Sequence, residues 1–203
     1  MFEWRTHVPA PGQAAPLIRS LRRGQERWNA AGLTTLGIWV EDLGSPGMVS
    51  SLWSYASLEA RETALAELAA EAGAVPAGDL AVVDHVESSL WRPTHYSPAP
   101  RVAAPLIELR MYDATPGRLA ALHERFATFT VEAFDRHGFE NCGYWTEYFG
   151  HSERLVYMVG FASLEHRERA WLAFGQDPGW QAAREKSERA VWAMRSPAPT
   201  RRM

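Results

Sequence analysis

Two short stretches of this sequence place charged and titratable residues at every second position. Glu3, Arg5 and His7 form one set, and Glu108, Arg110 and Tyr112 form the other. Alternate residues of a β-strand share one face of a sheet, so each set should present its side chains together. A histidine, with a reference pKa of about 6.5, can take a proton from an activated phenol or enol. An arginine can stabilise the resulting anion, which fits a cofactor-independent oxygenation or an isomerisation.

Other residues of interest lie in three further strand patterns. Trp39 and Trp145 share a strand face with Glu41 and Glu147, respectively, and His85 shares one with Val83 and Glu87 in a later strand. Tryptophan walls with a few charged groups suit a small, partly aromatic ligand. We therefore predict catalytic roles for His7, His85 and Tyr112, and ligand binding by Glu3, Arg5, Trp39, Glu108, Arg110 and Trp145.

Each of these candidates also has a structural interpretation. Glu and Arg two residues apart on one strand can form a salt-bridge ladder that satisfies polar groups between packed sheets, and this interpretation is favoured. Core packing is likewise favoured for the two tryptophans. Three functions therefore stay open: a ligand-binding protein, an enzyme, and a non-catalytic scaffold or interaction protein. An open cavity of roughly several hundred cubic ångströms would favour a ligand.

Metal and cofactor chemistry finds little support in the sequence. None of the 7 histidines lies three or four residues from another, and only a long-range grouping of His7, His85 and Glu87 could supply ligands. His123 and His166 fall in helical patterns, where we expect solvated faces. No glycine-rich phosphate loop or nucleophile elbow occurs. We predict no metal and no cofactor.

The elements that must position these residues occur twice. Glu3, Arg5 and Gly12 match Glu108, Arg110 and Gly117 at an offset of 105 residues. The offset becomes 106 within the first helix. From there it relates Gly32 to Gly138, Gly37 to Gly143, Trp39 to Trp145 and Gly44 to Gly150. It also relates Ser57-Leu58-Glu59 to Ser163-Leu164-Glu165 and Arg61-Glu62 to Arg167-Glu168. A repeat of about a hundred residues indicates two small domains and not a solenoid.

Each half reads as β-α-β-β-α-β, which predicts an α+β protein of two ferredoxin-like repeats. In the first half we predict strands at Phe2 to His7, Leu36 to Glu41, Met48 to Tyr55 and Leu80 to Leu90, and a helix from Gln13 to Ala31 with another beginning at Ser57. In the second half the strands are Ile107 to Tyr112, Cys142 to Glu147, Leu155 to Phe161 and Ala190 to Arg195, with a loose tail from Pro197. The domains are 1–92 and 106–203, joined by a Pro-rich linker, 93–105.

Two helices cover only one face of a four-stranded sheet. The duplication supplies a partner for the other face, because two sheets packed face to face bury both, as an intrachain α/β barrel. If the apolar residues of the first strands lie under the helices, then Glu3, Arg5, His7, Glu108, Arg110 and Tyr112 point into that barrel. Trp39, Trp145 and His85 join them.

Composition restricts the function classes. The chain has 203 residues, 46% of them hydrophobic, with 21 basic and 24 acidic side chains. No basic tract is interleaved with aromatics, so we predict no nucleic-acid partner. No apolar run approaches a membrane span and no leader is visible, and the one cysteine, Cys142, fits a reducing compartment. We predict a cytoplasmic protein without a membrane partner, whose helical faces are compatible with a homo-oligomer.

Several motifs resemble the NIPSNAP family. They are Glu108-Leu109-Arg110-x-Tyr112, Pro116-Gly117, Gly143-Tyr144-Trp145, Ser163-Leu164-x-x-Arg167 and Asp177-Pro178-x-Trp180. The first half resembles the family less closely, with His7 in the Tyr112 position and no Asp-Pro-x-Trp. The resemblance implies the dimeric α/β-barrel superfamily, which includes cofactor-free monooxygenases, lactone isomerases and haem-handling enzymes. It implies no catalytic residues. Eukaryotic members are associated with mitochondria and vesicle traffic, and no transit peptide is visible here.

Overall fold

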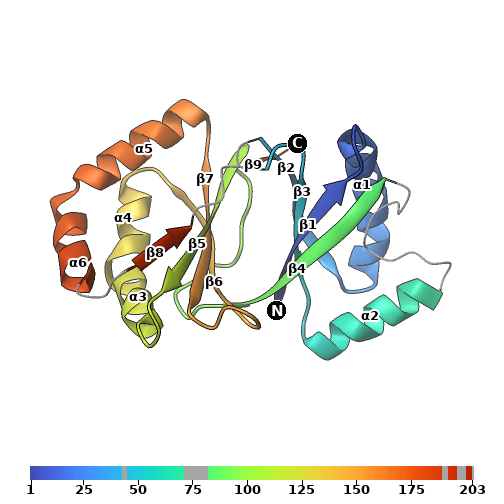
Figure 1. Ribbon diagram of the computed structural model, residues 1–203, viewed down its shortest axis with the longest axis horizontal. Helices are drawn as coiled ribbons and strands as arrows, with labels where there is room; N and C mark the ends of the chain where they lie inside the picture. The colour runs from blue at the N-terminus through green and yellow to red at the C-terminus, as the bar shows by residue number, and fades with distance from the viewer. Residues whose placement is uncertain (43–44, 71–81, 189–191, 196–199, 203) are drawn as a thin grey trace. The chain divides into compact units, whose positions relative to one another are not determined.

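The computed structural model describes residues 1–42, 45–70, 82–188, 192–195 and 200–202. They divide into two compact units, one built from Met1–Trp91 together with Arg202 and the other from Arg92–Arg201 (Figure 1). Each unit is an antiparallel sheet with helices on one side. In the described part of the chain, no helix is long and apolar enough to cross a membrane.

The first unit contains one complete β-α-β-β-α-β repeat. Its elements are β1 (Phe2–Pro9), α1 (Ala14–Ala30), β2 (Thr34–Glu41), β3 (Val49–Ser54), α2 (Leu58–Ala70) and β4 (Val83–Pro93). Strand β1 pairs with both β3 and β4, and β2 pairs with β3, all antiparallel. The resulting order, β4-β1-β3-β2, is the ferredoxin-like arrangement.

The second unit repeats this order. Its elements are β5 (Leu106–Ala114), α3 (Leu119–Arg125), the π-helix η1 (Phe126–Thr130), α4 (Val131–Arg136), β6 (Glu140–Glu147), β7 (Arg154–Phe161), α5 (Leu164–Gln176), α6 (Pro178–Glu188), β8 (Trp192–Arg195) and β9 (Thr200–Arg202). Strand β5 pairs with β7 and β8, and β6 pairs with β7. The order β8-β5-β7-β6 is again ferredoxin-like, so the predicted α+β class and the two repeats are confirmed.

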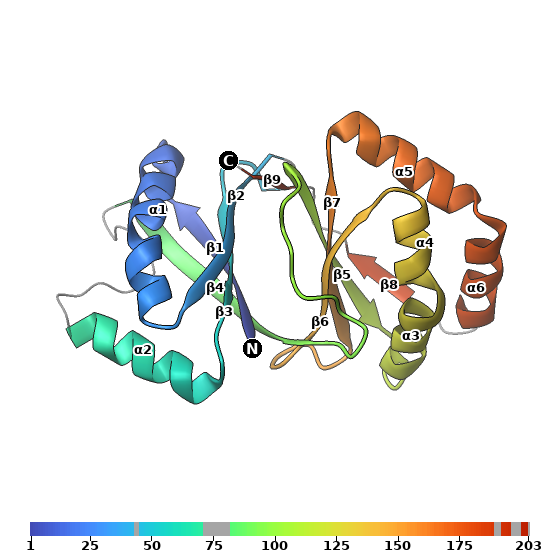
Figure 2. The same ribbon diagram turned by 180° about the vertical axis from the view of Figure 1, so that it is seen from behind.

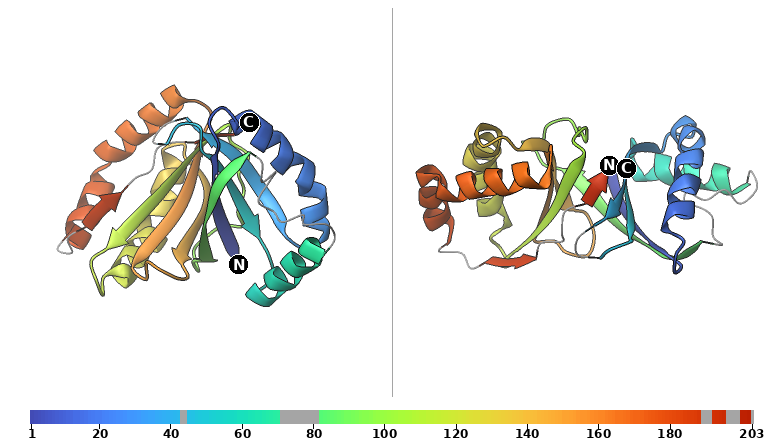
Figure 3. Two further views of the ribbon diagram at one scale, coloured as in Figure 1. Left: turned by 45° about the vertical axis from the view of Figure 1, so that its right-hand side comes forward. Right: turned by 90° about the horizontal axis from the view of Figure 1, so that it is seen from above.

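The helices of each unit lie on one face of their own sheet, which we call the helix-covered face (Figures 2 and 3). In the first unit, Leu17 and Leu21 of α1 and Leu68 of α2 pack with Trp53 of β3. In the second unit, Phe126 and Phe134 pack with Tyr144, Tyr157 and Phe174, each fully or almost fully buried. The opposite side of each sheet is called the helix-free face.

Helix ends follow the residues that predict them. Gly32 and Gly138 have φ of 88° and 81° after the first helix of each repeat, a left-handed conformation that favours glycine. The hydroxyls of Ser57 and Ser163 accept hydrogen bonds from Ala60 and His166 main-chain N–H groups, both at 3.1 Å.

The expected interruption of the last long helix is confirmed. Helix α5 ends at Gln176, and α6 begins at Pro178. Asp177 Oδ1 accepts hydrogen bonds from the N–H groups of Gly179 at 2.7 Å and Trp180 at 3.1 Å. Asp177 therefore caps α6, with proline at its first position.

Other expectations differ from the structure at the C-terminal end. The closing strand is β8, and its predicted start at Ala190 lies outside the described residues, as do Gly44 and Leu80 of other predicted elements. The expectation of a loose tail is wrong for Thr200–Arg202, because this strand pairs with β5 at Leu106 and Ile107. Residues 197–199 and 203 of that tail are outside the described part.

The change of offset between the repeats has a local cause. Helix α1 starts 105 residues before α3, at Ala14 and Leu119, and ends 106 residues before α4, at Ala30 and Arg136. The extra residue is absorbed by the π-helix Phe126–Thr130, whose wider turn holds one more residue while the flanking α-helical segments stay in register. The insertion therefore leaves both ends of the helix packed as in the first repeat.

The Pro-rich segment is an ordered part of the second unit. The N–H groups of Thr94 and Arg101 donate to the carbonyls of Tyr144 at 2.9 Å and Cys142 at 3.1 Å. The segment thus runs along the edge of β6, and Ala104 lies against Gly160, where a Cβ would come within 2.6 Å of it. We call residues 94–104 the edge strap.

Deleting Ala127, an exposed residue of the π-helix, should convert that turn to α-helix and keep the register on both sides. We expect a loss of at most about 2 kcal/mol in the free energy of unfolding. Deleting Arg23 from the regular helix α1 is the matched control, because it rotates the buried Trp28 away from the core. That deletion should cost about 3–5 kcal/mol. Equal losses in chemical denaturation would contradict the insertion account.

Candidate functional site

Glu108 of β5 is the centre of a buried charged cluster. Arg110 Nη1 donates to its Oε1 at 2.6 Å. From α5, Arg167 donates through Nε to Oε2 at 2.7 Å and through Nη2 to Oε1 at 3.1 Å, and Trp171 Nε1 donates to Oε2 at 2.9 Å. Both carboxylate oxygens are therefore fully engaged.

Glu3 of β1 forms the same cluster in the first repeat. Arg5 Nε donates to Oε1 at 2.8 Å, and Arg61 of α2 donates to both oxygens, at 2.6 and 3.0 Å. The hydroxyl of Tyr55 donates to Oε2 at 3.3 Å. Arg61 and Arg167 occupy equivalent positions, so each repeat uses one arginine of its second helix to bind the acidic residue of its first strand.

These contacts shift the pKa values of the charged groups. Burial alone raises the pKa of Glu3, but hydrogen bonds and charge interactions with Arg61 and Arg5 outweigh it and lower the pKa to about 2. The same balance lowers the pKa of Glu108. Burial lowers the pKa of Arg110, yet interactions with Tyr157, Tyr112 and Glu108 leave it above the ordinary value. Glu3, Glu108 and Arg110 are therefore held in their charged forms.

The predicted facing of the first strands is wrong. Glu3, Arg5, Glu108 and Arg110 lie on the helix-covered face, because their counter-charges come from the helices. The apolar residues of these strands, such as Trp4 and Leu109, lie on the helix-free face. The geometry favours the structural interpretation of the Glu–Arg pairs. The sequence signal was the arginine repeated at positions 61 and 167.

His7 and Tyr112 follow their strands onto the helix-covered face. His7 Nε2 lies 3.2 Å from Ser51 Oγ, and the Tyr157 hydroxyl donates to that of Tyr112 at 2.9 Å. These two pairs occupy equivalent positions, so the His–Ser pair of one repeat is exchanged as a unit for the Tyr–Tyr pair of the other. His7 is fully buried, and Tyr112 is half-buried.

His85 does not join His7. In the sheet, His85 is opposite Val8 and His7 is opposite Val86, which puts the two histidines on opposite faces. His85 is exposed, with its Nδ1 3.0 Å from Asp84 and its Nε2 3.8 Å from Glu87. The grouping of His7, His85 and Glu87 is therefore not formed. Within the described ranges, no three His, Cys, Asp or Glu side chains are arranged to hold a metal ion.

Trp39 and Trp145 lie on the helix-free faces, as predicted for the second strands. Each indole folds back over the glycine two residues earlier, where a Cβ on Gly37 or Gly143 would come within 2.4 Å of the ring. A side chain larger than hydrogen is excluded there. Both glycines follow a β-bulge.

The first unit has a row of stacked tryptophans on this face. Trp4 stacks on Trp39 with ring centres 5.5 Å apart and on Trp91 at 5.7 Å. Trp91 Nε1 donates to Ser89 Oγ at 2.8 Å. Trp39 Nε1 is buried, and no described residue accepts a hydrogen bond from it. A buried N–H without an acceptor is unfavourable by about 1–3 kcal/mol, which makes this group a candidate ligand contact.

His123 has a role that sequence reasoning missed. Its Nδ1 lies 2.7 Å from the Tyr96 hydroxyl, and its Nε2 lies 3.4 Å from Thr146 Oγ1. Burial, with a smaller effect of His95, lowers the pKa of His123. The expectation of a solvated His123 is wrong because Tyr96, in the edge strap, covers it. No periodic pattern in the sequence relates that strap to the helix.

Replacing Arg61 or Arg167 with Met should leave a buried carboxylate without its helical partner. We expect each variant to lose about 3–5 kcal/mol in the free energy of unfolding. Arg169→Met is the control, since Arg169 forms an exposed pair with Glu165 at 2.6 Å on the same helix as Arg167 and should lose at most about 1 kcal/mol. Urea denaturation measures all three. Similar values would show that the clusters do not hold the helices.

The lowered pKa of Glu3 also predicts a pH dependence. Its stabilising effect is complete above the unfolded pKa of about 4.5 and is lost as pH falls toward about 2. The difference corresponds to a contribution on the order of 3 kcal/mol. In Glu3→Gln this part of the acid destabilisation should vanish, so the unfolding free energy should fall less between pH 5 and pH 2.5 than in the wild type. Parallel curves for the two proteins would refute the assignment.

Comparison with known proteins identifies the repeats. The NIPSNAP family model matches residues 2–98 and again residues 107–198. No curated protein sequence matches. An uncharacterised NIPSNAP domain protein from Burkholderia xenovorans is 20% identical, over 46% of this chain and 90% of its own, with a TM-score of 0.42.

Two solved structures resemble the whole chain in fold. A proposed monooxygenase from Lactobacillus acidophilus is 10% identical over 99% of this chain and 95% of its own, with a TM-score of 0.66. An anthrone oxidase-like protein is 13% identical over 99% of this chain and 90% of its own, with a TM-score of 0.62. At these identities the likeness concerns the fold alone. The two family matches cover nearly all of the sequence, and the chain belongs to the NIPSNAP family, with two tandem copies of its domain.

Proposed function

We propose that this protein binds a small, partly aromatic ligand on the helix-free face of its first sheet. The observation that carries the proposal is the buried Trp39 N–H, for which no described residue is an acceptor. A ligand oxygen beside Trp39 would satisfy that donor. The rings of Trp4 and Trp91 stack beside Trp39 and are themselves 5% and 0% exposed, so an aromatic ligand would have to separate these rings and pack between them.

We further propose that the two helix-free faces enclose this ligand as an intrachain barrel. Each face has an apolar part: Trp4 and Leu52 belong to the first face, which also has Thr6, Ser50 and Glu87, and Ile107, Leu109 and Met158 belong to the second. An apolar face that no helix covers requires another partner, and the second repeat offers a surface of the same kind. Binding inside such a barrel would exclude water from the ligand.

We propose binding of a ligand and no chemical conversion of it. Turnover that uses His7 and His85 in one site loses its geometric basis, since they lie on opposite faces of the sheet. An oxygenation or isomerisation would have to rely on other groups, of which Tyr112 is the best placed. Its hydroxyl accepts a hydrogen bond from Tyr157, and its ring centre lies 5.6 Å from Cζ of the Arg110 guanidinium. A protein that binds no ligand would be a scaffold.

A matched pair of probes tests the proposal. Tetralin and 1-tetralone share one shape, but only the ketone has a hydrogen-bond acceptor. In the wild type, 1-tetralone should bind about tenfold more tightly than tetralin, in ligand-detected NMR titrations. Trp39→Phe keeps a ring and removes the N–H, so the preference should disappear.

Trp91→Phe is the control variant. Its N–H is already bound to Ser89, so this substitution should leave the preference for the ketone unchanged. Failure of both probes to bind, or a preference that survives in Trp39→Phe, would overturn the proposed site.

A further inference from the structure

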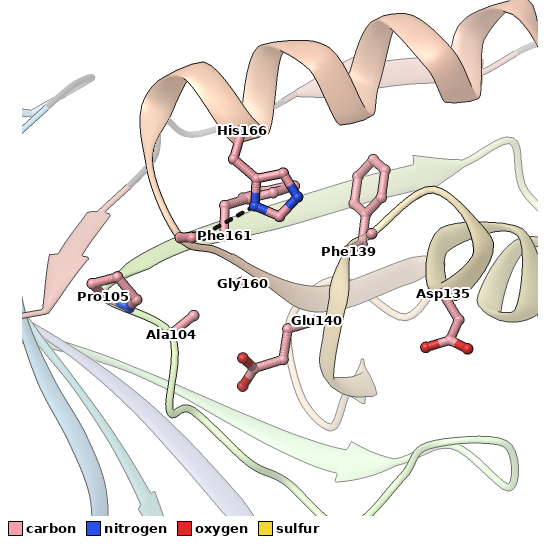
Figure 4. A pocket seen from close by; sticks show the side chains of 10 residues that line it. Ala104, Pro105, Asp135, Phe139, Glu140, Gly160, Phe161 and His166 are labelled. Carbon is pink, nitrogen blue, oxygen red and sulfur yellow. Dashed lines mark hydrogen bonds between the residues drawn. The ribbon is translucent and has the colours of Figure 1, made fainter.

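A cavity of about 370 Å³ opens at one edge of the second sheet (Figure 4). Its walls come from the end of the edge strap, the connection between α4 and β6, the end of β7 and the start of α5. The residues that matter for recognition are Pro105, Asp135, Gly138, Glu140, Gly160 and His166. The volume lies within the range of small-molecule sites.

Two carboxylates line this cavity without a cationic partner. Glu140 Oε1 accepts a hydrogen bond from the Ala103 N–H at 3.2 Å, which fixes the side chain by a neutral contact. Among the residues that the structure describes, no Arg, Lys or His forms an ion pair with Glu140 or Asp135. Neighbouring acidic side chains differ, because Glu132 and Asp177 both pair with Arg136. The cavity therefore has an uncompensated negative charge.

His166 supplies a hydrogen-bond donor of known position. Its Nδ1 accepts the N–H of Ala162 at 3.2 Å, the dashed contact in Figure 4, so the proton of the neutral ring is on Nε2. Gly138 leaves space beside that atom: a Cβ there would come within 3.1 Å of Nε2. Figure 4 shows Gly160 between Glu140 on one side and His166 on the other. The cavity thus joins negative charge to a neutral N–H donor.

The first repeat is an internal comparison for these residues. At the offset of 106, Asp135, Glu140 and His166 correspond to Asn29, Thr34 and Ala60, all uncharged. Gly138 corresponds to Gly32, and both have a left-handed conformation. The fold therefore needs the glycine at this corner in both repeats, but it forms equally well without the three ionisable side chains. In the second repeat Glu140 and His166 each accept one main-chain hydrogen bond, from Ala103 and Ala162, and these contacts leave the other carboxylate oxygen and the Nε2–H group available to a ligand.

We propose that this cavity is a second ligand site, specific for a small organic cation that carries an amino group and a hydrogen-bond acceptor. The ammonium group lies against Glu140, where a carboxylate contact is charge-assisted, and Asp135 adds negative charge at another part of the cavity wall. The acceptor of the ligand receives a hydrogen bond from the Nε2–H group of His166. The site is independent of Trp39 and of the function proposed for the helix-free faces.

Three phenols of similar size and different charge test this site. They are tyramine, a cation; 4-ethylphenol, which is neutral; and 3-(4-hydroxyphenyl)propionate, an anion. In NMR titrations of the full chain, tyramine should bind at least about tenfold more tightly than either analogue. Equal affinities, or no binding of tyramine, would overturn the proposal.

Substitutions to the residues of the first repeat locate the site. Glu140→Thr and Asp135→Asn should each weaken tyramine binding about tenfold. His166→Ala should remove the preference for tyramine over phenethylamine, which lacks the hydroxyl. Glu140→Thr and His166→Ala each remove one main-chain hydrogen bond, from Ala103 or Ala162, so the melting temperatures should fall by only a few degrees.

Glu132→Gln on α4 is the control, since Glu132 does not line the cavity and is paired with Arg136. It should bind tyramine as the wild type does. Weakening by Glu132→Gln equal to that by Glu140→Thr would show a non-specific charge effect and refute the site. Undiminished binding in Glu140→Thr would refute it as well.

Discussion

A buried carboxylate between two guanidinium groups is the interaction on which each repeat depends. It joins the first strand to the second helix, two elements more than fifty residues apart in sequence. A buried ion pair gains little over an apolar contact, but it tolerates no loss of a partner, so it specifies the position of the helix more than it adds stability. The helix-covered face is thereby fixed, and the apolar residues of the same strand are left on the other face.

The tandem duplication separates what the fold requires from what it does not. The acidic residue, its two arginines, the positive-φ glycine and the Gly-x-Trp strand occur in both repeats and serve the same contacts. Other positions differ as sets, such as the His7–Ser51 pair and the Tyr112–Tyr157 pair. Positions that differ without a change of backbone are where the repeats are free to acquire separate ligands.

Much of the fold was predictable because local chemistry determines it. Caps such as Ser57 and Asp177 and the repeated glycines act within a few residues of the chain. The period of two along β1 correctly separated two sets of side chains, but it could not say which set the helices cover. The usual inference, apolar residues under the helices, failed because Arg61 and Arg167 neutralise the buried acids. The surroundings of His123 and the cavity lined by Glu140 and His166 both depend on the edge strap, and no periodic pattern in the sequence predicts the path of that strap.

The edge strap also has a consequence for how the protein behaves at high concentration. Strand β6 pairs with β7 along one side, and unpaired main-chain groups on the other side of a strand can bind strands from other molecules. The strap occupies several main-chain groups of β6, and its prolines cannot themselves donate to a further ladder. Without the strap, the main-chain carbonyls of Cys142 and Tyr144 would be left to accept hydrogen bonds from another chain.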